Sequence, residues 1–180
     1  FEGKIPQPGT LRESDQELLA VIREGFEEVG GRIEKVELKA ALAEAMRLAS
    51  EVNKYLDIHA PWFEIKTDRD QAAKSLYTAI QAISWLKLMF APFLPETCEQ
   101  LHQTLCEGKS IFGVLNQESV RDSLDEHAVL RLDSSKALTQ AGVDLWQARD
   151  LEAGKAFGKP SPLFKKLDHS IVDEERARLG

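Results

Sequence analysis

Apolar side chains recur every three or four residues over most of the first 106 residues. This spacing places them along one face of an α-helix. Ser14, followed by Glu17 three residues later, predicts a capping box at the start of the first helix, and Gly30–Gly31 predicts its end. The apolar stripe between these signals consists of Leu18, Ile22, Phe26 and Val29.

A second helix is predicted by a longer stripe whose members alternate steps of four and three residues. It should end before Pro61, because the residue that precedes a proline disfavours helical backbone. The members of this stripe are Leu38, Leu42, Ala45, Ala49, Val52 and Leu56.

Two further helices follow on either side of Pro92. Asp68 and Gln71 predict a capping box that opens the first of them, and its wide apolar face (Leu76, Ile80, Ile83, Leu86 and Phe90) suggests a central helix. Pro95 suits a first helical position. The stripe of the second helix contains Leu94, Cys98, Leu101 and Leu105.

The remainder of the chain is less regular. Residues 170–179 predict a short final helix, "AVLRL" predicts a strand, and the rest of residues 107–143 is interpreted as loop. Strands and helices do not alternate, so the predicted class is all-α, an antiparallel helix bundle with an irregular C-terminal extension. We divide the chain into a bundle (1–106), an insertion (107–143) and an extension (144–180).

Composition is that of a globular domain, with 180 residues, 43% hydrophobic and 29% charged. A run long enough to span a membrane and a signal peptide are both absent from the sequence. Two cysteines without a CxxC motif favour a reducing, cytoplasmic setting without a disulfide. The opening "FEGKIPQPG" has no initiator Met and looks like the loop after a helix, which suggests a piece of a longer protein.

Motifs that carry catalysis are missing from the sequence. GxGxxG, the phosphate-binding P-loop, GxSxG and HExxH do not occur. His102 lies one helical turn after Cys98, but two ligands do not make a zinc site. We therefore predict no catalytic and no metal-binding residue in this segment.

Two segments exceed this background. In "EVNKYLDIHAPWFEIKTD" (51–68), the expected roles are structural: Trp62 covers the end of the bundle, Asn53 ties down loop carbonyls, and Tyr55 belongs to the same corner. In "DLWQARDLEAGKAFGKPSPLFKKLD" (144–168), Trp146 stands in a loop that looks unable to bury it.

These segments resemble the C-terminal helical domain of methionyl-tRNA synthetases. "NKYLDIHAPWFEIK" is similar to the family's Asn–basic–Tyr … Pro-Trp … Lys signature, "LMFAPFLPETCEQLHQTL" to its last bundle helix, and "PSPLFKKLD" to the segment that returns toward the catalytic half. The resemblance runs from Phe1 to about Asp168, with residues 107–143 matching poorly.

The resemblance implies a fold of the class I synthetase anticodon-binding type and a parent enzyme that ligates methionine to tRNA(Met). That parent would use ATP with magnesium in its own catalytic domain, whose HIGH-like and KMSKS-like motifs are absent from this segment. The implied partners are the tRNA(Met) anticodon and that catalytic domain, in the cytoplasm and without a membrane. An anticodon-reading Asn-x-x-x-Arg pair on the family's first helix would precede Phe1.

The resemblance also implies that Trp146 occupies the position of a tryptophan that stacks on an anticodon base. Phe112 is a rival whose spacing to "PLF" fits poorly. Stacking on an exposed aromatic ring is a general means of reading single-stranded RNA. We expect Arg149, Lys155 and Lys159 to give less specific supporting contacts.

Charge qualifies this hypothesis. The net charge of −7 argues against a general nucleic-acid binder, yet residues 146–169 carry five basic and three acidic side chains, a balance of +2 that leaves −9 elsewhere. Two alternatives remain: the equivalent domain of a related leucyl, isoleucyl, valyl or cysteinyl enzyme, and a helical adaptor that binds protein through Trp146 and the insertion.

Overall fold

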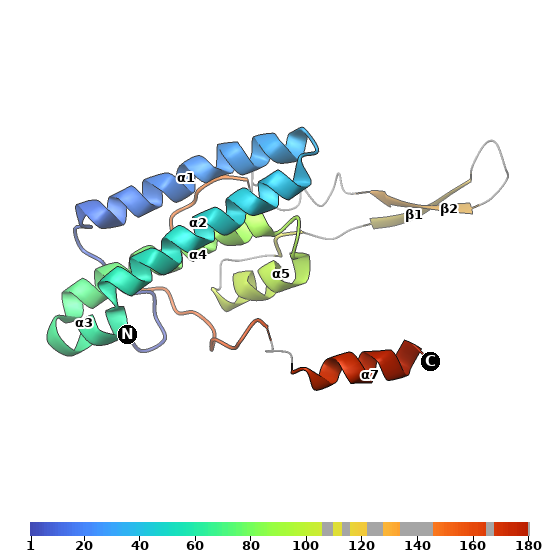
Figure 1. The fold of residues 1–180 in the computed structure, drawn as a ribbon. Helices are drawn as coiled ribbons and strands as arrows, with labels where there is room; N and C mark the ends of the chain where they lie inside the picture. The colour runs from blue at the N-terminus through green and yellow to red at the C-terminus, as the bar shows by residue number, and fades with distance from the viewer. Residues whose placement is uncertain (106–109, 113–115, 122–127, 134–145, 165–167, 180) are drawn as a thin grey trace.

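The computed structural model describes residues 1–105, 110–112, 116–121, 128–133, 146–164 and 168–179. Its elements in chain order are shown in Figure 1. They are α1 (Glu13–Glu34), α2 (Leu38–His59), α3 (Pro61–Thr67), α4 (Arg69–Phe90), α5 (Pro95–Thr104), β1 (Asn116–Arg121), β2 (Ala128–Asp133) and α7 (Ser170–Leu179).

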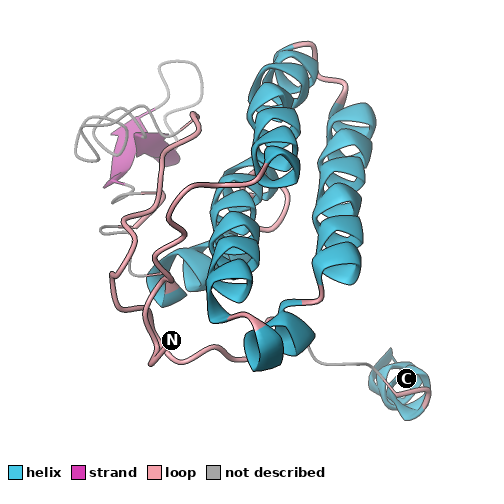
Figure 2. Ribbon diagram, turned by 90° about the vertical axis from the view of Figure 1, so that its left-hand side faces the viewer, coloured by secondary structure: helices cyan, strands magenta, loops and turns pink. Residues whose placement is uncertain are grey.

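The three long helices α1, α2 and α4 contact one another in pairs and form the body of the bundle (Figures 1 and 2). Their shared core is apolar, and α5 packs against α4. The all-α prediction for the bundle is therefore confirmed. The fully buried side chains at the centre of this core include Ile22, Val29, Leu48, Trp85 and Met89.

Helix α1 buries the predicted stripe, but both predicted ends are wrong. The carboxylate of Asp15 accepts a hydrogen bond from the backbone N–H of Arg12 at 2.8 Å, so the reciprocal cap lies two residues before the predicted Ser14 box. The helix also continues through Gly30–Gly31 to Glu34. Glycine lowers helix propensity without forbidding helix, and here packing against the rest of the bundle compensates.

Helix α2 has the predicted bounds, and its predicted stripe is right in part: Ala45 and Val52 are buried, but the centre of the buried face is shifted. Leu38 is 51% exposed, and the outer face of this helix also carries Leu42 and Met46. Small side chains allow α1 to approach closely, since a Cβ on Gly25 would collide with Leu48. The buried positions repeat the same four-and-three spacing in another register: Ala41, Ala45, Leu48, Val52 and Tyr55.

Helix α4 is central, as predicted, because none of residues 71–90 is exposed. The side chain of Asp68 caps it by accepting from the backbone N–H groups of Asp70 and Gln71 at 3.0 and 3.1 Å. The predicted answering role of Gln71 is wrong, because its side-chain oxygen accepts from Arg12 instead. Alanines such as Ala79 and Ala82 fill the buried face where larger residues were expected.

The paired strands β1 and β2 and helix α7 extend away from the bundle (Figure 1). Strands β1 and β2 pair antiparallel, from Asn116 opposite Asp133 to Arg121 opposite Ala128. The strand predicted at "AVLRL" is confirmed, whereas its polar partner β1 was not anticipated. Helix α7 has the predicted bounds and is exposed along most of its described length.

The C-terminal extension is held along the bundle by hydrogen bonds. The side chain of Gln81 donates to the carbonyl of Arg149 at 2.8 Å and accepts from the N–H of Leu151 at 2.6 Å. Trp85 donates its indole N–H to the same Arg149 carbonyl. Further along, Ile5 donates its backbone N–H to the carbonyl of Lys155 and so joins the extension to the N-terminal segment.

Candidate nucleic-acid interface

The corner between α2 and α4 exposes its aromatic residues. Ala60 ends α2 in left-handed backbone (φ 41°), and Pro61 opens α3 as its one buried residue. Trp62 is 51% exposed and Phe63 is 63% exposed. The prediction that Trp62 covers the bundle end is therefore wrong, because Pro61 takes the inward position at this corner.

The exposed rings form a contiguous group with a cation. The ring centroids of Trp62 and Phe63 lie 6.4 Å apart at an interplanar angle of 63°. The ammonium group of Lys66 lies 5.5 Å from the centroid of Phe63. We call these three residues the aromatic corner. Exposed aromatic faces beside a positive charge suit stacking of single-stranded bases.

Other residues of the 51–68 segment divide between core and surface. Tyr55 is buried, in agreement with its predicted structural role. Asn53 is exposed within the body of α2. The expectation that Asn53 ties down loop carbonyls is wrong, because the helix continues for six residues beyond it.

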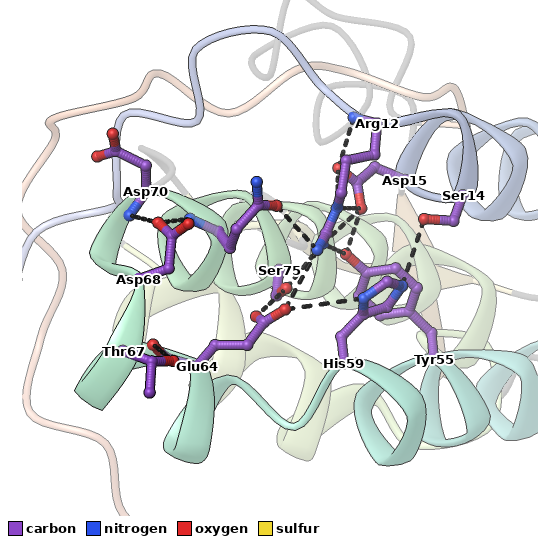
Figure 3. Close-up of polar contacts among 11 residues, drawn as sticks. Arg12, Ser14, Asp15, Tyr55, His59, Glu64, Thr67, Asp68, Asp70 and Ser75 are labelled. Atoms are coloured by element: carbon purple, nitrogen blue, oxygen red, sulfur yellow. Dashed lines mark hydrogen bonds and ion pairs between the residues drawn. The ribbon is translucent and has the colours of Figure 1, made fainter.

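A polar cluster includes Glu64, which lies in α3 with the aromatic corner (Figure 3). We call it the Arg12 network, and Arg12 is its hub. The guanidinium donates to Asp15 at 2.8 Å, to Tyr55 at 3.0 Å and to Ser75 at 2.7 Å. It also reaches the side-chain oxygens of Glu64 and Gln71. The network thus joins the start of α1 to α2, α3 and α4.

The electrostatics of this network favour a charged Asp15 and a neutral Tyr55. Burial alone would raise the pKa of Asp15, but hydrogen bonds from Arg12 and Tyr55 outweigh it and hold the pKa below its ordinary value. Burial, together with the adjacent Asp15 carboxylate, raises the pKa of Tyr55 to about 12. Tyr55 therefore remains a hydrogen-bond donor to Asp15, at 2.6 Å.

His59 packs against this cluster from the end of α2. Its ring centroid lies 4.4 Å from that of Tyr55, and its Nε2 lies 3.3 Å from the hydroxyl of Ser14. Burial and the positive charge of Arg12 lower the pKa of His59. A neutral imidazole is therefore the favoured form at neutral pH.

Trp146 lies at the other end of α1 and is partly buried. Its indole N–H donates to the carbonyl of Phe26 at 2.9 Å, and the two rings meet edge to face with centroids 5.8 Å apart. A Cβ on Gly30 would lie 2.6 Å from the indole nitrogen, so this glycine makes room for the ring. These contacts fix the ring of Trp146 against α1.

The predicted basic helpers are distributed along the extension. Arg149 is exposed beside α4, and Lys155 joins the N-terminal segment through its backbone. Lys159 is exposed and follows Gly158, whose N–H donates to the carbonyl of Thr104 in α5. Their backbone contacts place them at successive points along the bundle, from α4 to the N-terminal segment and α5. Phe112, the rival, is 37% exposed.

The described residues contain no group of three or more His, Cys, Asp or Glu side chains suited to a metal ion. Cys98 is buried, which raises the pKa of its thiol to about 11. It is therefore a packing residue between α4 and α5. Cys106 and His127 lie outside the described residues.

Sequence reasoning missed both the Arg12 network and the exposure of Trp62. Arg12 precedes the first helix in a polar stretch, and nothing local distinguishes it from a surface arginine. One signal was available: Asp15 lies on the apolar face of α1, in line with Leu18 and Ile22, and it follows Arg12 by three residues, the spacing of a reciprocal cap.

Among the described helices, none is both long and apolar enough to cross a membrane.

A protein-family model, described as the anticodon binding domain of methionyl tRNA ligase, matches residues 5–131 of this chain. A methionine–tRNA ligase of Thermomicrobium roseum is 46% identical over 179 residues, which cover 99% of this chain and 30% of that protein. One of Chloroflexus aurantiacus is 41% identical, over 98% of this chain and 29% of that protein.

A solved structure of Mycobacterium tuberculosis methionyl-tRNA synthetase in complex with methionyl-adenylate has a similar fold. The TM-score is 0.67 at 20% sequence identity, over 92% of this chain and 28% of that one. The chain thus spans about 30% of the length of the relatives that it matches. On the family match over residues 5–131, the chain belongs to the anticodon-binding domain family of methionyl-tRNA ligases.

Proposed function

We propose that this domain binds the anticodon of tRNA(Met) within a longer, cytoplasmic methionine–tRNA ligase. The observation that carries the proposal is the family match over residues 5–131. The parent enzyme would join methionine to its tRNA with ATP and magnesium in its own catalytic domain. The present segment would recognise the tRNA and perform no chemistry.

The family match weighs against the equivalent domain of a leucyl, isoleucyl, valyl or cysteinyl enzyme, because the matching model and the named relatives are all of the methionyl family. It weighs equally against a protein-binding adaptor. An adaptor would bind no tRNA when tested as part of its full-length chain.

Two tryptophans are candidates for base stacking. Trp62 has the greater free surface, a neighbouring aromatic ring and a cation, all in the aromatic corner. Trp146, to which the sequence pointed, has a rigid mount but already covers part of its ring against Phe26. A stacking residue needs an open ring face, and this requirement favours Trp62.

The two sites are well separated. Arg12, which bonds Glu64 of α3, precedes α1, whereas Trp146 contacts Phe26 and Gly30 further along the same helix. Fourteen or more residues of helix separate these contacts, which corresponds to roughly 20–25 Å at a rise of about 1.5 Å per residue. We therefore assign the principal stack to Trp62 and keep Trp146 as the second candidate, with Arg149, Lys155 and Lys159 as electrostatic support.

The experiment compares Trp62→Ala and Trp146→Ala in the full-length ligase. Loss of one stack, about 1–3 kcal/mol, should lower kcat/KM for tRNA roughly five- to a hundredfold, while ATP–pyrophosphate exchange with methionine stays unchanged. The corresponding Trp→Phe variant should lie between wild type and Ala. Arg149→Ala, Lys155→Ala and Lys159→Ala should each give a smaller, salt-sensitive loss.

The variant that loses tRNA aminoacylation identifies the stacking residue. Equal loss of pyrophosphate exchange would instead indicate a folding defect. If neither tryptophan affects tRNA aminoacylation, base stacking by this domain is wrong.

A further inference from the structure

Helix α3 carries the aromatic corner but has little core of its own. It contains seven residues, of which Pro61 alone is buried. Trp62, Phe63 and Ile65 are all exposed. A helix this short is marginal by itself, so its orientation must come from contacts with other elements.

Beside the buried Pro61 and the packing of α3 on α4, Glu64 supplies the polar contacts. One carboxylate oxygen accepts from the hydroxyl of Ser75 in α4 at 2.6 Å, and the other accepts from the guanidinium of Arg12 at 3.2 Å. In the part of the chain that the structure describes, Glu64 is the one α3 side chain with a hydrogen bond or ion pair to another element. It is the polar anchor of this helix.

Arg12 is itself held firmly before it meets Glu64. Asp15 is completely buried and binds both the Nε and an NH2 group of Arg12. The hydroxyl of Tyr55 binds the same guanidinium. A planar guanidinium that donates to several fixed acceptors presents its remaining N–H in a defined direction.

Because Glu64 and Trp62 lie on the same helix, the contacts of Glu64 also set the direction of the Trp62 ring. Trp62 and Glu64 are two residues apart, which corresponds to about 200° around a helix axis. When Glu64 is drawn inward to Arg12 and Ser75, Trp62 is turned outward. Phe63, at about 100°, completes the exposed face beside it.

We propose that Arg12 and Glu64 are positioning residues for RNA recognition, because they orient α3 so that Trp62 and Phe63 face the tRNA. The inference rests on the proposed function and deepens it. Arg12 and Glu64 act through Trp62 and do not contact the RNA themselves. Their loss should therefore raise KM for tRNA while leaving kcat at saturating tRNA and pyrophosphate exchange unchanged.

The test is a double-mutant cycle in the full-length ligase, with Glu64→Ala, Trp62→Ala and the double variant. Glu64→Ala should raise KM for tRNA roughly three- to thirtyfold, which is at most the effect of removing the stack itself. In the Trp62→Ala background, Glu64→Ala should raise KM for tRNA little further, because the ring that Glu64 orients is already absent. Glu64→Gln keeps an acceptor oxygen and should recover part of the wild-type KM.

Glu44→Ala is the matched control. Glu44 is paired with Arg47, and its side chain is 18% exposed, compared with 20% for Glu64, but it lies in α2 away from α3. The Glu44→Ala substitution removes one negative charge from the domain, as Glu64→Ala does. It should leave KM for tRNA at the wild-type value.

The outcomes separate this inference from the proposed function. If Trp62→Ala weakens tRNA use but Glu64→Ala has no effect, or has an effect fully additive with it, the positioning role is wrong and the stacking role stands. If Glu64→Ala lowers pyrophosphate exchange as much as aminoacylation, its role is general stability and the inference is overturned. If Trp62→Ala has no effect on KM for tRNA, the stacking assignment to Trp62 fails and the positioning role fails with it.

Discussion

The indole nitrogen of Trp146 lies 2.6 Å from the point where a Cβ on Gly30 would stand. The ring therefore occupies the space that only glycine leaves open on this turn of α1. The same nitrogen donates to the carbonyl of Phe26, one helical turn earlier. Gly30, which the sequence predicted at the end of a helix, instead lies within α1 and leaves room for the ring of Trp146.

Gly30→Ala and Gly31→Ala should therefore have opposite effects on stability. Replacing glycine by alanine inside a helix gains up to about 1 kcal/mol of helix propensity. At Gly31 nothing lies within 4 Å of the new Cβ, so we expect this gain to be realised. At Gly30 the new Cβ displaces Trp146 from its hydrogen bond, and we expect a net loss of about 1 kcal/mol. Chemical denaturation measures the free energy of unfolding of the two variants. A gain in stability in both would show that the position of Trp146 does not depend on glycine at residue 30.

Trp62→Ala should barely change the free energy of unfolding. Its side chain is 51% exposed, and Pro61 takes the buried position at the corner. A substitution at such a site costs at most about 1 kcal/mol, whereas a buried tryptophan would cost about 3–5 kcal/mol. The midpoint of urea denaturation distinguishes the two values, and a large shift would mean that the ring packs against the domain in solution.

Asp15→Asn should destabilise the domain at neutral pH and reduce the loss of stability in acid. The folded-state pKa of Asp15 lies below its ordinary value, so its stabilisation is present above the unfolded pKa and is lost as pH falls through the folded one. We expect the substitution to cost about 2–3 kcal/mol at pH 7, because it removes a charged partner of Arg12. The difference in stability between wild type and variant should begin to shrink below about pH 4 and should be lost once the pH falls below the folded-state pKa. Denaturation curves from pH 7 to pH 2 test this, and a constant difference across that range would contradict it.

Gln81→Leu should release the C-terminal extension from α4. Gln81 is buried, and its amide bonds both the carbonyl of Arg149 and the N–H of Leu151. Leucine has a similar volume but leaves the N–H of Leu151 without that acceptor, at a cost of about 1–3 kcal/mol. Limited proteolysis near residues 149–151 should accelerate, while cleavage within α1 should not. Unchanged cleavage at the extension would show that Trp85 and Ile5 suffice to hold it.

The sequence by itself determined the features that depend on near neighbours. The bounds of α2 and α7, the cap of Asp68 on α4 and the stripe Leu18–Ile22–Phe26–Val29 all follow from spacing and capping chemistry, and the structure agrees. These signals are local, because a helix is closed by hydrogen bonds between residues four apart.

Tertiary contacts decided what local spacing left open. Two stripes on α2 have the same four-and-three spacing and share Ala45 and Val52. Burial of Ala41 and Leu48, and not of Leu38 and Leu42, goes with the close approach of α1 at Gly25. Likewise, a long helix through Gly30 exists because the bundle packs around it.

The candidate site depended most on the tertiary structure. Arg12 meets Tyr55 and Glu64, which follow it by 43 and 52 residues in the sequence, so no local pattern links it to them. The exposure of Trp62 is decided by the same contacts, because the anchor of Glu64 sets which face of α3 is turned outward. The sequence determined the long helices of the bundle and the bounds of α2, whereas packing decided how far α1 extends and which aromatic ring is exposed.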